Sequence, residues 1–190
     1  YSEFLRKKTY MLANPFEKDN NFLNTNPLKG HKSPKKIVTP ASSEKMIREV
    51  ENLRTLDCRL LQSKNYEVFF SKAKDIPNIL HEIGRLREIT FREVGEGTNE
   101  SIDLDKYDQY YRHLFLWDDE TNKIAGAYRM GLGCEIYPKY GMDGFYLNGL
   151  FRFEPELHEM LHKSIEMGRA FIIKEYQQKP MPLFLLWRGI

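Results

Sequence analysis

One long amphipathic segment lies between two pairs of short, strand-like segments, and this order constrains the fold more than any other feature. Between Asp75 and Phe91, apolar residues recur at helical spacing, which predicts a helix that buries one face and is capped by Asp75. The strand-like segments are residues 56–62, 66–71, 113–117 and 124–130. Each pair is joined by turn-forming residues and therefore predicts a hairpin. Hairpins interrupted by helices favour an α+β domain.

Further helices and one more strand complete the expected order. A helix is expected to begin at residue 42 or 43, because Met46, Val50 and Leu53 then fall on one face. We also expect a glycine-rich irregular stretch at 141–149, a short helix at 155–162, a strand at 164–173 and a helix at 182–188.

The composition excludes several classes of protein. Hydrophobic residues make up 41% and charged residues 29% of the 190-residue chain, so it is not disordered throughout. No run reaches the roughly 18 apolar residues of a membrane-spanning helix. Cys58 and Cys134 are too few for a disulfide scaffold and too isolated for a zinc site. A reducing cytoplasm is therefore the expected location.

Residues 1–45 differ in charge from the rest of the chain. They hold nine Lys and Arg against four Asp and Glu, whereas residues 46–190 are slightly acidic. Four of the nine prolines also lie there, so we interpret residues 1–45 as a basic interdomain linker. The alternative is a peripheral contact with anionic lipid at the inner face of the membrane. No dense basic stripe indicates nucleic-acid binding.

Several charged residues interrupt apolar segments and are candidates for a functional site. Arg87 shares a helix face with Phe91, so an arginine near the core needs a carboxylate partner, for which Asp105, Asp108 and Glu166 are candidates. The alternative for each charge is an exposed salt bridge, which contributes little to stability.

The last predicted strand carries two of these charges. Glu166 and Arg169 lie three positions apart, which predicts that they point to opposite faces of the sheet. Of the histidines, only His158 and His162 have a helical metal-ligand spacing, and they lack a third ligand, so no metal site is expected.

Five short motifs occur in an order that resembles a known family. The motifs are Arg87–Phe91, Leu104–Asp108, His113–Trp117, Gly126–Arg129 and Glu166–Arg169. They resemble the ornithine-lipid-type N-acyltransferases of the GNAT superfamily, often labelled hemolysin-like. The more distant acyl-homoserine-lactone autoinducer synthases share the same skeleton of motifs. The likeness covers about residues 56–190, and residues 1–45 resemble the tail of a glycerolipid O-acyltransferase domain.

This resemblance implies a particular fold and extent. The fold would be a GNAT-like mixed, mostly antiparallel sheet flanked by helices. Residues 46–190 would form the N-terminal two-thirds of that domain, with the last strands of the sheet missing. We therefore expect exposed apolar surface, a dimer that completes the sheet, and low activity for this chain alone.

The resemblance also implies an activity. The family transfers a fatty acyl chain from acyl carrier protein, or from acyl-CoA, to the amino group of an amino acid in bacterial aminolipid synthesis. No permanently bound cofactor is implied, and the acyl-phosphopantetheine of the carrier protein would be the donor. Its arm would lie along the strand at 164–173, and the implied donor-binding residues are Phe171, Ile173, Gln177, Gln178 and Lys179. Pro180 and Pro182 replace the usual glycine-rich turn, which favours a carrier-protein donor over coenzyme A.

The family motifs suggest roles for the charged residues. Glu166 would act as the general base, and Arg129 would bind the acceptor's carboxylate. Asp105 and Asp108 would bind the amino-acid substrate. Arg87 and Arg169 would hold these acids in place and so belong to the substrate site. The alternative is that all six residues form one structural ion network.

Two other functions remain open at this point. The chain could be a carrier-protein- or lipid-binding module that has lost catalysis. It could also be a signal synthase that uses S-adenosylmethionine as the amine, like the autoinducer enzymes. Against the second stands the sequence Val94-Gly95-Glu96-Gly97, where those enzymes carry an aromatic residue.

Overall fold

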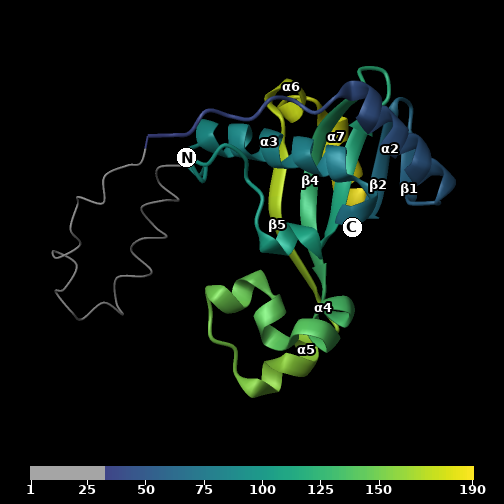
Figure 1. The fold of residues 1–190 in the computed structure, drawn as a ribbon. Helices are drawn as coiled ribbons and strands as arrows, with labels where there is room; N and C mark the ends of the chain where they lie inside the picture. Colours follow the sequence, from purple (N-terminus) through teal and green to yellow (C-terminus); the bar gives the residue numbers. More distant parts are fainter. Residues whose placement is uncertain (1–32) are drawn as a thin grey trace. The chain divides into compact units, whose positions relative to one another are not determined.

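The computed structural model describes residues 33–190, which form a five-stranded antiparallel sheet with helices packed on both faces (Figure 1). The strands are β1 (Arg59–Ser63), β2 (Tyr66–Lys72), β3 (Arg112–Asp118), β4 (Lys123–Leu132) and β5 (Ile165–Ile172). They are hydrogen-bonded in the order β1-β2-β3-β4-β5, and every neighbouring pair is antiparallel. The α+β fold and both predicted hairpins are confirmed.

The helices lie before, between and after the strands. They are α2 (Ser43–Thr55), α3 (Pro77–Glu93), α4 (Gly133–Tyr140), α5 (His158–His162), α6 (Lys174–Gln177) and α7 (Pro180–Arg188). Five short 3₁₀ helices join them: η3 (Ala73–Asp75), η4 (Lys106–Gln109), η5 (Gly141–Gly144), η6 (Tyr146–Gly149) and η7 (Pro155–Leu157). No helix among the described residues combines the length and apolar character that crossing a membrane requires. Most of the predicted linker at 1–45 lies outside the described residues.

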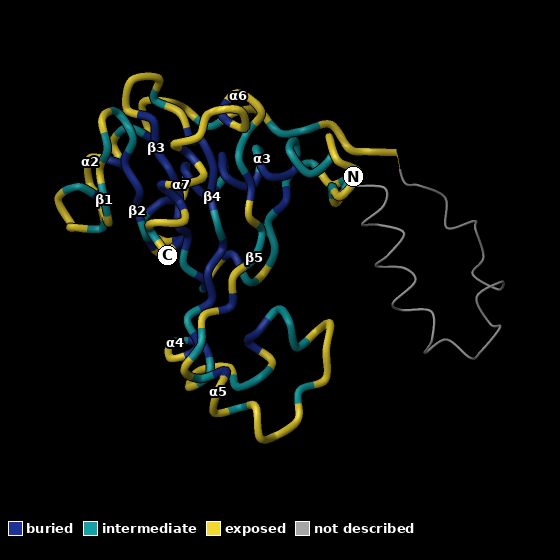
Figure 2. Tube along the Cα trace, turned by 180° about the vertical axis from the view of Figure 1, so that it is seen from behind, coloured by how far each residue is buried: buried dark blue, intermediate teal, exposed yellow. Residues whose placement is uncertain are grey.

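The sheet is the middle layer of three. Helices α2 and α3 cover one face, where Val50, Ile83 and Phe115 belong to a common apolar core. Helix α7 covers the other face, where Leu186 packs with Leu114. Figure 2 shows that the central strands are largely buried, as expected for strands covered on both sides.

The start of α3 differs from the prediction. Asp75 lies in η3 and does not cap α3, whose first helical residue is Pro77. The backbone N–H groups of Asn78 and Ile79 instead donate to the carboxylate of Glu49 on α2, at 2.9 and 2.8 Å. A tertiary contact therefore satisfies amides that a local cap usually satisfies, and it also ties the two helices together.

A helical excursion, residues 133–164, is inserted between β4 and β5. It runs from α4 to α5 and extends past one end of the sheet (Figure 1). It has its own small apolar core, in which Ile136, Phe145 and Leu161 pack against Tyr111. Helix α4 was not predicted, because Pro138 within it and the glycines on either side are breaker signals.

The pairing of β4 with β5 contains an irregularity. Arg129 pairs with Gly168 and Ala127 pairs with Phe171, so β5 has one more residue than β4 across this interval. Arg169 takes up the extra length with a φ of 52°, a left-handed conformation. The other edge of β5 has no strand partner among residues 33–190.

Candidate functional site

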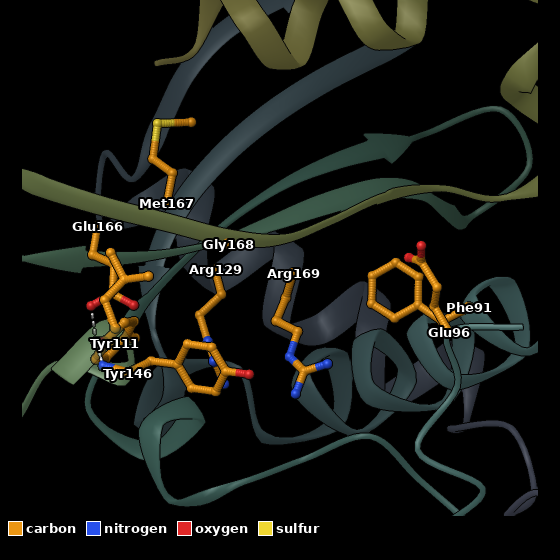
Figure 3. Close-up of a pocket in the computed structure, with 10 residues that line it drawn as sticks. Phe91, Glu96, Tyr111, Arg129, Tyr146, Glu166, Met167, Gly168 and Arg169 are labelled. Atoms are coloured by element: carbon orange, nitrogen blue, oxygen red, sulfur yellow. Dashed lines mark hydrogen bonds between the residues drawn. The ribbon is translucent and has the colours of Figure 1, made fainter. Parts of the chain in front are cut away.

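A cavity of about 280 Å³ lies against β5, at the position of the bulge (Figure 3). Residues from β5, from the end of α3 and from η6 contribute to its wall. The lining residues are Phe91, Glu96, Tyr111, Arg129, Tyr146, Leu147, Glu166, Met167, Gly168 and Arg169. It therefore contains three of the charged residues that the sequence identified, and they come from two adjacent strands.

Beneath the cavity, Arg87 is the centre of a buried ion network. Its Nη1 and Nη2 donate to the two carboxylate oxygens of Asp108 at 3.1 and 2.9 Å. Its Nε donates to Asp103 Oδ2 at 2.9 Å. Arg87 is 1% exposed and Asp108 is fully buried. Such a forked, fully paired geometry is what permits these charges to lie in the core.

Arg129 extends this network to the cavity. Its Nη1 donates to Asp105 Oδ1 at 2.7 Å and to Asp108 Oδ2 at 3.2 Å. Burial alone would raise the pKa of Asp108, but the guanidinium of Arg87, and then that of Arg129, hold it below its ordinary value. Asp108 is therefore ionised at neutral pH and fixes the position of both arginines.

Five of the six predicted charged residues belong to this one network. Arg169 joins it through Nη1, which lies 3.4 Å from Asp103 Oδ2. The sequence did not single out Asp103, which lies two positions before Asp105 and is 2% exposed. Glu166 stands apart from the network, with no salt bridge to any arginine in residues 33–190.

Glu166 is held by a tyrosine instead. The hydroxyl of Tyr111 donates to Glu166 Oε2 at 2.8 Å (Figure 3). Burial raises the pKa of Glu166 above its ordinary value. This effect is opposed, but not cancelled, by the Tyr111 hydroxyl, by the backbone N–H groups of Leu147 and Tyr146, and by the charge of Arg129. A partly buried carboxylate with a raised pKa is suited to accept a proton near neutral pH.

The prediction that Glu166 and Arg169 point to opposite faces of the sheet is wrong. Both line the same cavity. The simple alternation of a strand fails here because Arg169 itself lies in the bulge, and its left-handed φ turns it to the side of Glu166.

An aromatic ring lies between the two cavity arginines. The guanidinium carbons of Arg129 and Arg169 are 5.3 and 5.7 Å from the centre of the Tyr146 ring. The rings of Tyr107 and Tyr111 are also within cation–π distance of Arg129. The charge of Arg129 is therefore surrounded by tyrosine rings. Its Nη1 is bonded to carboxylates, whereas its Nε and Nη2 donate to no acceptor in residues 33–190.

The predicted donor-binding residues follow the cavity along β5 and the turn after it. Phe171 is buried in the core and Ile173 packs against it, and the backbone N–H of Ile173 donates to Ala125 of β4 at 3.0 Å. Gln177 Nε2 donates to the carbonyl oxygen of Ile172 at 2.9 Å. Gln178 is exposed, and Lys179 Nζ lies 4.3 Å from the centre of the Tyr176 ring. No group of three or more metal-ligating side chains occurs within the described part of the chain.

These features define an α+β domain with a polar cavity at a bulged edge strand. The chain belongs to the GNAT acetyltransferase domain family, because residues 86–187, more than half of its length, match the model of that domain. The superfamily expected from the five motifs is thereby confirmed. The finer likeness to ornithine-lipid-type, hemolysin-like proteins stays a prediction.

Two curated relatives are similar to most of the chain. A glycine N(alpha)-acyltransferase of Bacteroides thetaiotaomicron is 36% identical over 146 residues, which cover 74% of this chain and 43% of the relative. A protein of the same name from Phocaeicola vulgatus is 36% identical over 146 residues, covering 74% of this chain and 44% of the relative. The chain thus spans less than half the length of these relatives. No solved structure matches.

Proposed function

We propose that the protein is an N-acyltransferase that moves a fatty acyl chain from a thioester to the amino group of an amino acid. The observation that carries this proposal is the cavity itself. It combines a buried carboxylate of raised pKa, Glu166, with the guanidinium groups of Arg129 and Arg169. The family match and the names of the two relatives point the same way.

Glu166 is the general base in this proposal. The acceptor enters as an ammonium ion and must lose a proton before its nitrogen lone pair can attack. Glu166 takes that proton, directly or through a water. The nitrogen then forms a bond to the thioester carbonyl carbon, the carbon–sulfur bond breaks, and the sulfur leaves with the bonding electrons. The proton lost when the tetrahedral intermediate collapses neutralises the thiolate.

The arginines bind the acceptor's carboxylate. The Nε and Nη2 of Arg129 remain available to an anion, and Arg169 borders the same cavity. Both oxygens of Asp108 are already bonded by Arg87, so the proposal gives Asp105 and Asp108 the task of positioning Arg129. Because the two relatives are named for glycine, glycine is the first acceptor to test.

The acyl donor would lie along the unpaired edge of β5. Beside this edge, Tyr128, Phe171 and Leu183 contribute to an apolar depression of about 160 Å³, which suits an acyl or pantetheine chain. Pro180 at the start of α7 has no N–H to offer a phosphate, which favours acyl carrier protein over coenzyme A as the source. A role in aminolipid synthesis follows from this donor and acceptor.

The location and partners belong to the same proposal. A carrier-protein donor places the reaction in the cytoplasm. The basic residues at 1–45 support peripheral contact with the inner face of the membrane, on the grounds of charge alone.

The test is incubation of the full-length protein with long-chain acyl thioesters of carrier protein and of coenzyme A, in separate reactions. Each is offered a panel of amino acids, and N-acyl products are measured by mass spectrometry. Glu166→Gln should lower kcat/KM about 100-fold or more. Glu156→Gln, which changes an exposed glutamate of η7, is the matched control and should behave as wild type. Acylation of alcohols but of no amine would indicate an O-acyltransferase, and absence of any product would indicate a binding module.

A further inference from the structure

The segment from η5 to η6 forms one wall of the cavity, and it is the part of the site that the helical excursion supplies. Tyr146 reaches the cavity from the helical excursion between β4 and β5 (Figure 3). Leu147, the next residue, also lines the cavity. The other walls belong to the sheet and to the end of α3.

Several contacts hold this wall in place. The hydroxyl of Tyr110 donates to the carbonyl oxygen of Gly144 at 2.9 Å, and the N–H of Tyr146 donates to the hydroxyl of Tyr111 at 3.0 Å. Between them, Phe145 is 1% exposed in the small core of the excursion. The backbone directly before Leu147 is thus held in place, and a fixed wall can discriminate by size.

Leu147 is also close to the proposed base. Both residues line the same cavity, and the backbone N–H of Leu147 contributes to lowering the pKa of Glu166. An amine bound at Glu166 therefore shares this cavity with Leu147. The acceptor's carboxylate, drawn toward Arg129, fixes the second end of the molecule, and the substituent on its α-carbon must fit in the space that remains.

We infer that Leu147 limits the size of the acceptor's side chain and so makes the enzyme selective for an α-amino acid with no side chain. This inference rests on the proposed N-acyltransferase function. The cavity of about 280 Å³ has to hold both the acceptor and the reacting end of the acyl thioester. A branched side chain at one wall then decides whether a methyl group on the acceptor is tolerated.

The substitution Leu147→Ala tests this inference. Leu147 is only half-buried and belongs to none of the apolar cores, so its truncation should leave the fold intact. In the full-length protein, with one long-chain acyl carrier protein thioester, kcat/KM is measured for glycine and for alanine. We expect the glycine-to-alanine ratio to fall about tenfold or more, the usual effect of one methyl group against a fitted wall. Leu147→Phe should raise KM for glycine.

Leu150→Ala is the matched control, because Leu150 follows η6, is 59% exposed and does not line the cavity. It should leave the ratio as in wild type. The Leu147→Ala protein should still acylate glycine and unfold at the wild-type temperature. If its glycine-to-alanine ratio of kcat/KM is then the same as in wild type, the inference is overturned but the proposed function is not. A wild-type protein that acylates no amine overturns the proposed function, and the inference with it.

Discussion

At the residue scale, the hydroxyl of Tyr111 connects the two parts of the site. It donates to Glu166 and accepts from the N–H of Tyr146, so it positions both the proposed base and the wall opposite it. Tyr111 is itself 2% exposed, and burial raises its pKa well above the ordinary value of a tyrosine. The hydroxyl therefore stays protonated and acts as a donor at every pH at which the enzyme would work.

The variant Tyr111→Phe should change the pH dependence of the reaction. In the wild-type protein, the hydrogen bond from the Tyr111 hydroxyl lowers the pKa of Glu166. Removing this bond should therefore raise that pKa further. Because only ionised Glu166 accepts a proton, kcat/KM falls as the pH drops through this pKa, and the acid limb should move up by about one pH unit. Tyr110→Phe, whose hydroxyl bonds Gly144 and not Glu166, should leave the acid limb in place. If the acid limb of the kcat/KM profile is the same in Tyr111→Phe as in wild type, Tyr111 does not set the pKa of Glu166.

At the scale of elements, the ion network is what joins α3, the loop before β3, and strands β4 and β5. Arg87 comes from α3, Asp103 and Asp108 from the loop, Arg129 from β4 and Arg169 from β5. These elements are distant in sequence, so the network forms only when the sheet and helix are both in place. Its members are expected to contribute to stability as well as to the site.

The variant Asp108→Asn should destabilise the fold by about 3–5 kcal/mol at neutral pH, because Arg87 and Arg129 lose their shared buried anion. The folded-state pKa of Asp108 is lower than its unfolded value of about 3.9. Its contribution is therefore complete above that value and is lost as the pH falls through the folded pKa. Urea unfolding at about pH 7 and about pH 3 measures the free energy of unfolding of the variant and of wild type, and the difference between them should be smaller at the acid pH. An equal difference at the two pH values would contradict the stabilising role of ionised Asp108.

The sequence predicts elements well where periodicity is strong and fails where tertiary contacts decide. Helix α3 and the hairpins follow from apolar spacing, whereas the start of α3 depends on Glu49 from another helix. The bulge at Arg169 was not predicted; its one local signal is Gly168, a glycine inside the strand, because an arginine adopts a left-handed φ only when its surroundings impose it. Gly126 belongs to one of the five motifs, but only the fold explains why a glycine is needed there. A Cβ at this position would lie 2.5 Å from the carbonyl oxygen of Phe171.

At the scale of the whole molecule, the cavity and the outer edge of β5 lie on the same margin of the sheet. Strand β5 has no partner on that side in the described residues. Helix α7, whose Leu183 lies beside β5, also exposes Phe184 and Trp187, the latter 65% exposed. Exposed apolar side chains next to an open strand edge mark a surface that associates with another chain or with ligand.

The 190-residue chain should therefore self-associate through the exposed apolar face of α7, which leaves the outer edge of β5 open to an acyl donor. Phe184→Glu places a charge on the exposed face of α7 and should shift the chain to monomer in sedimentation velocity. Leu60→Glu is the matched control, since Leu60 is 50% exposed on β1 at the opposite edge of the sheet, and it should leave the association unchanged. Dissociation by Leu60→Glu instead would assign the contact to the β1 edge. A wild-type chain that is monomeric throughout the concentration series would contradict the prediction.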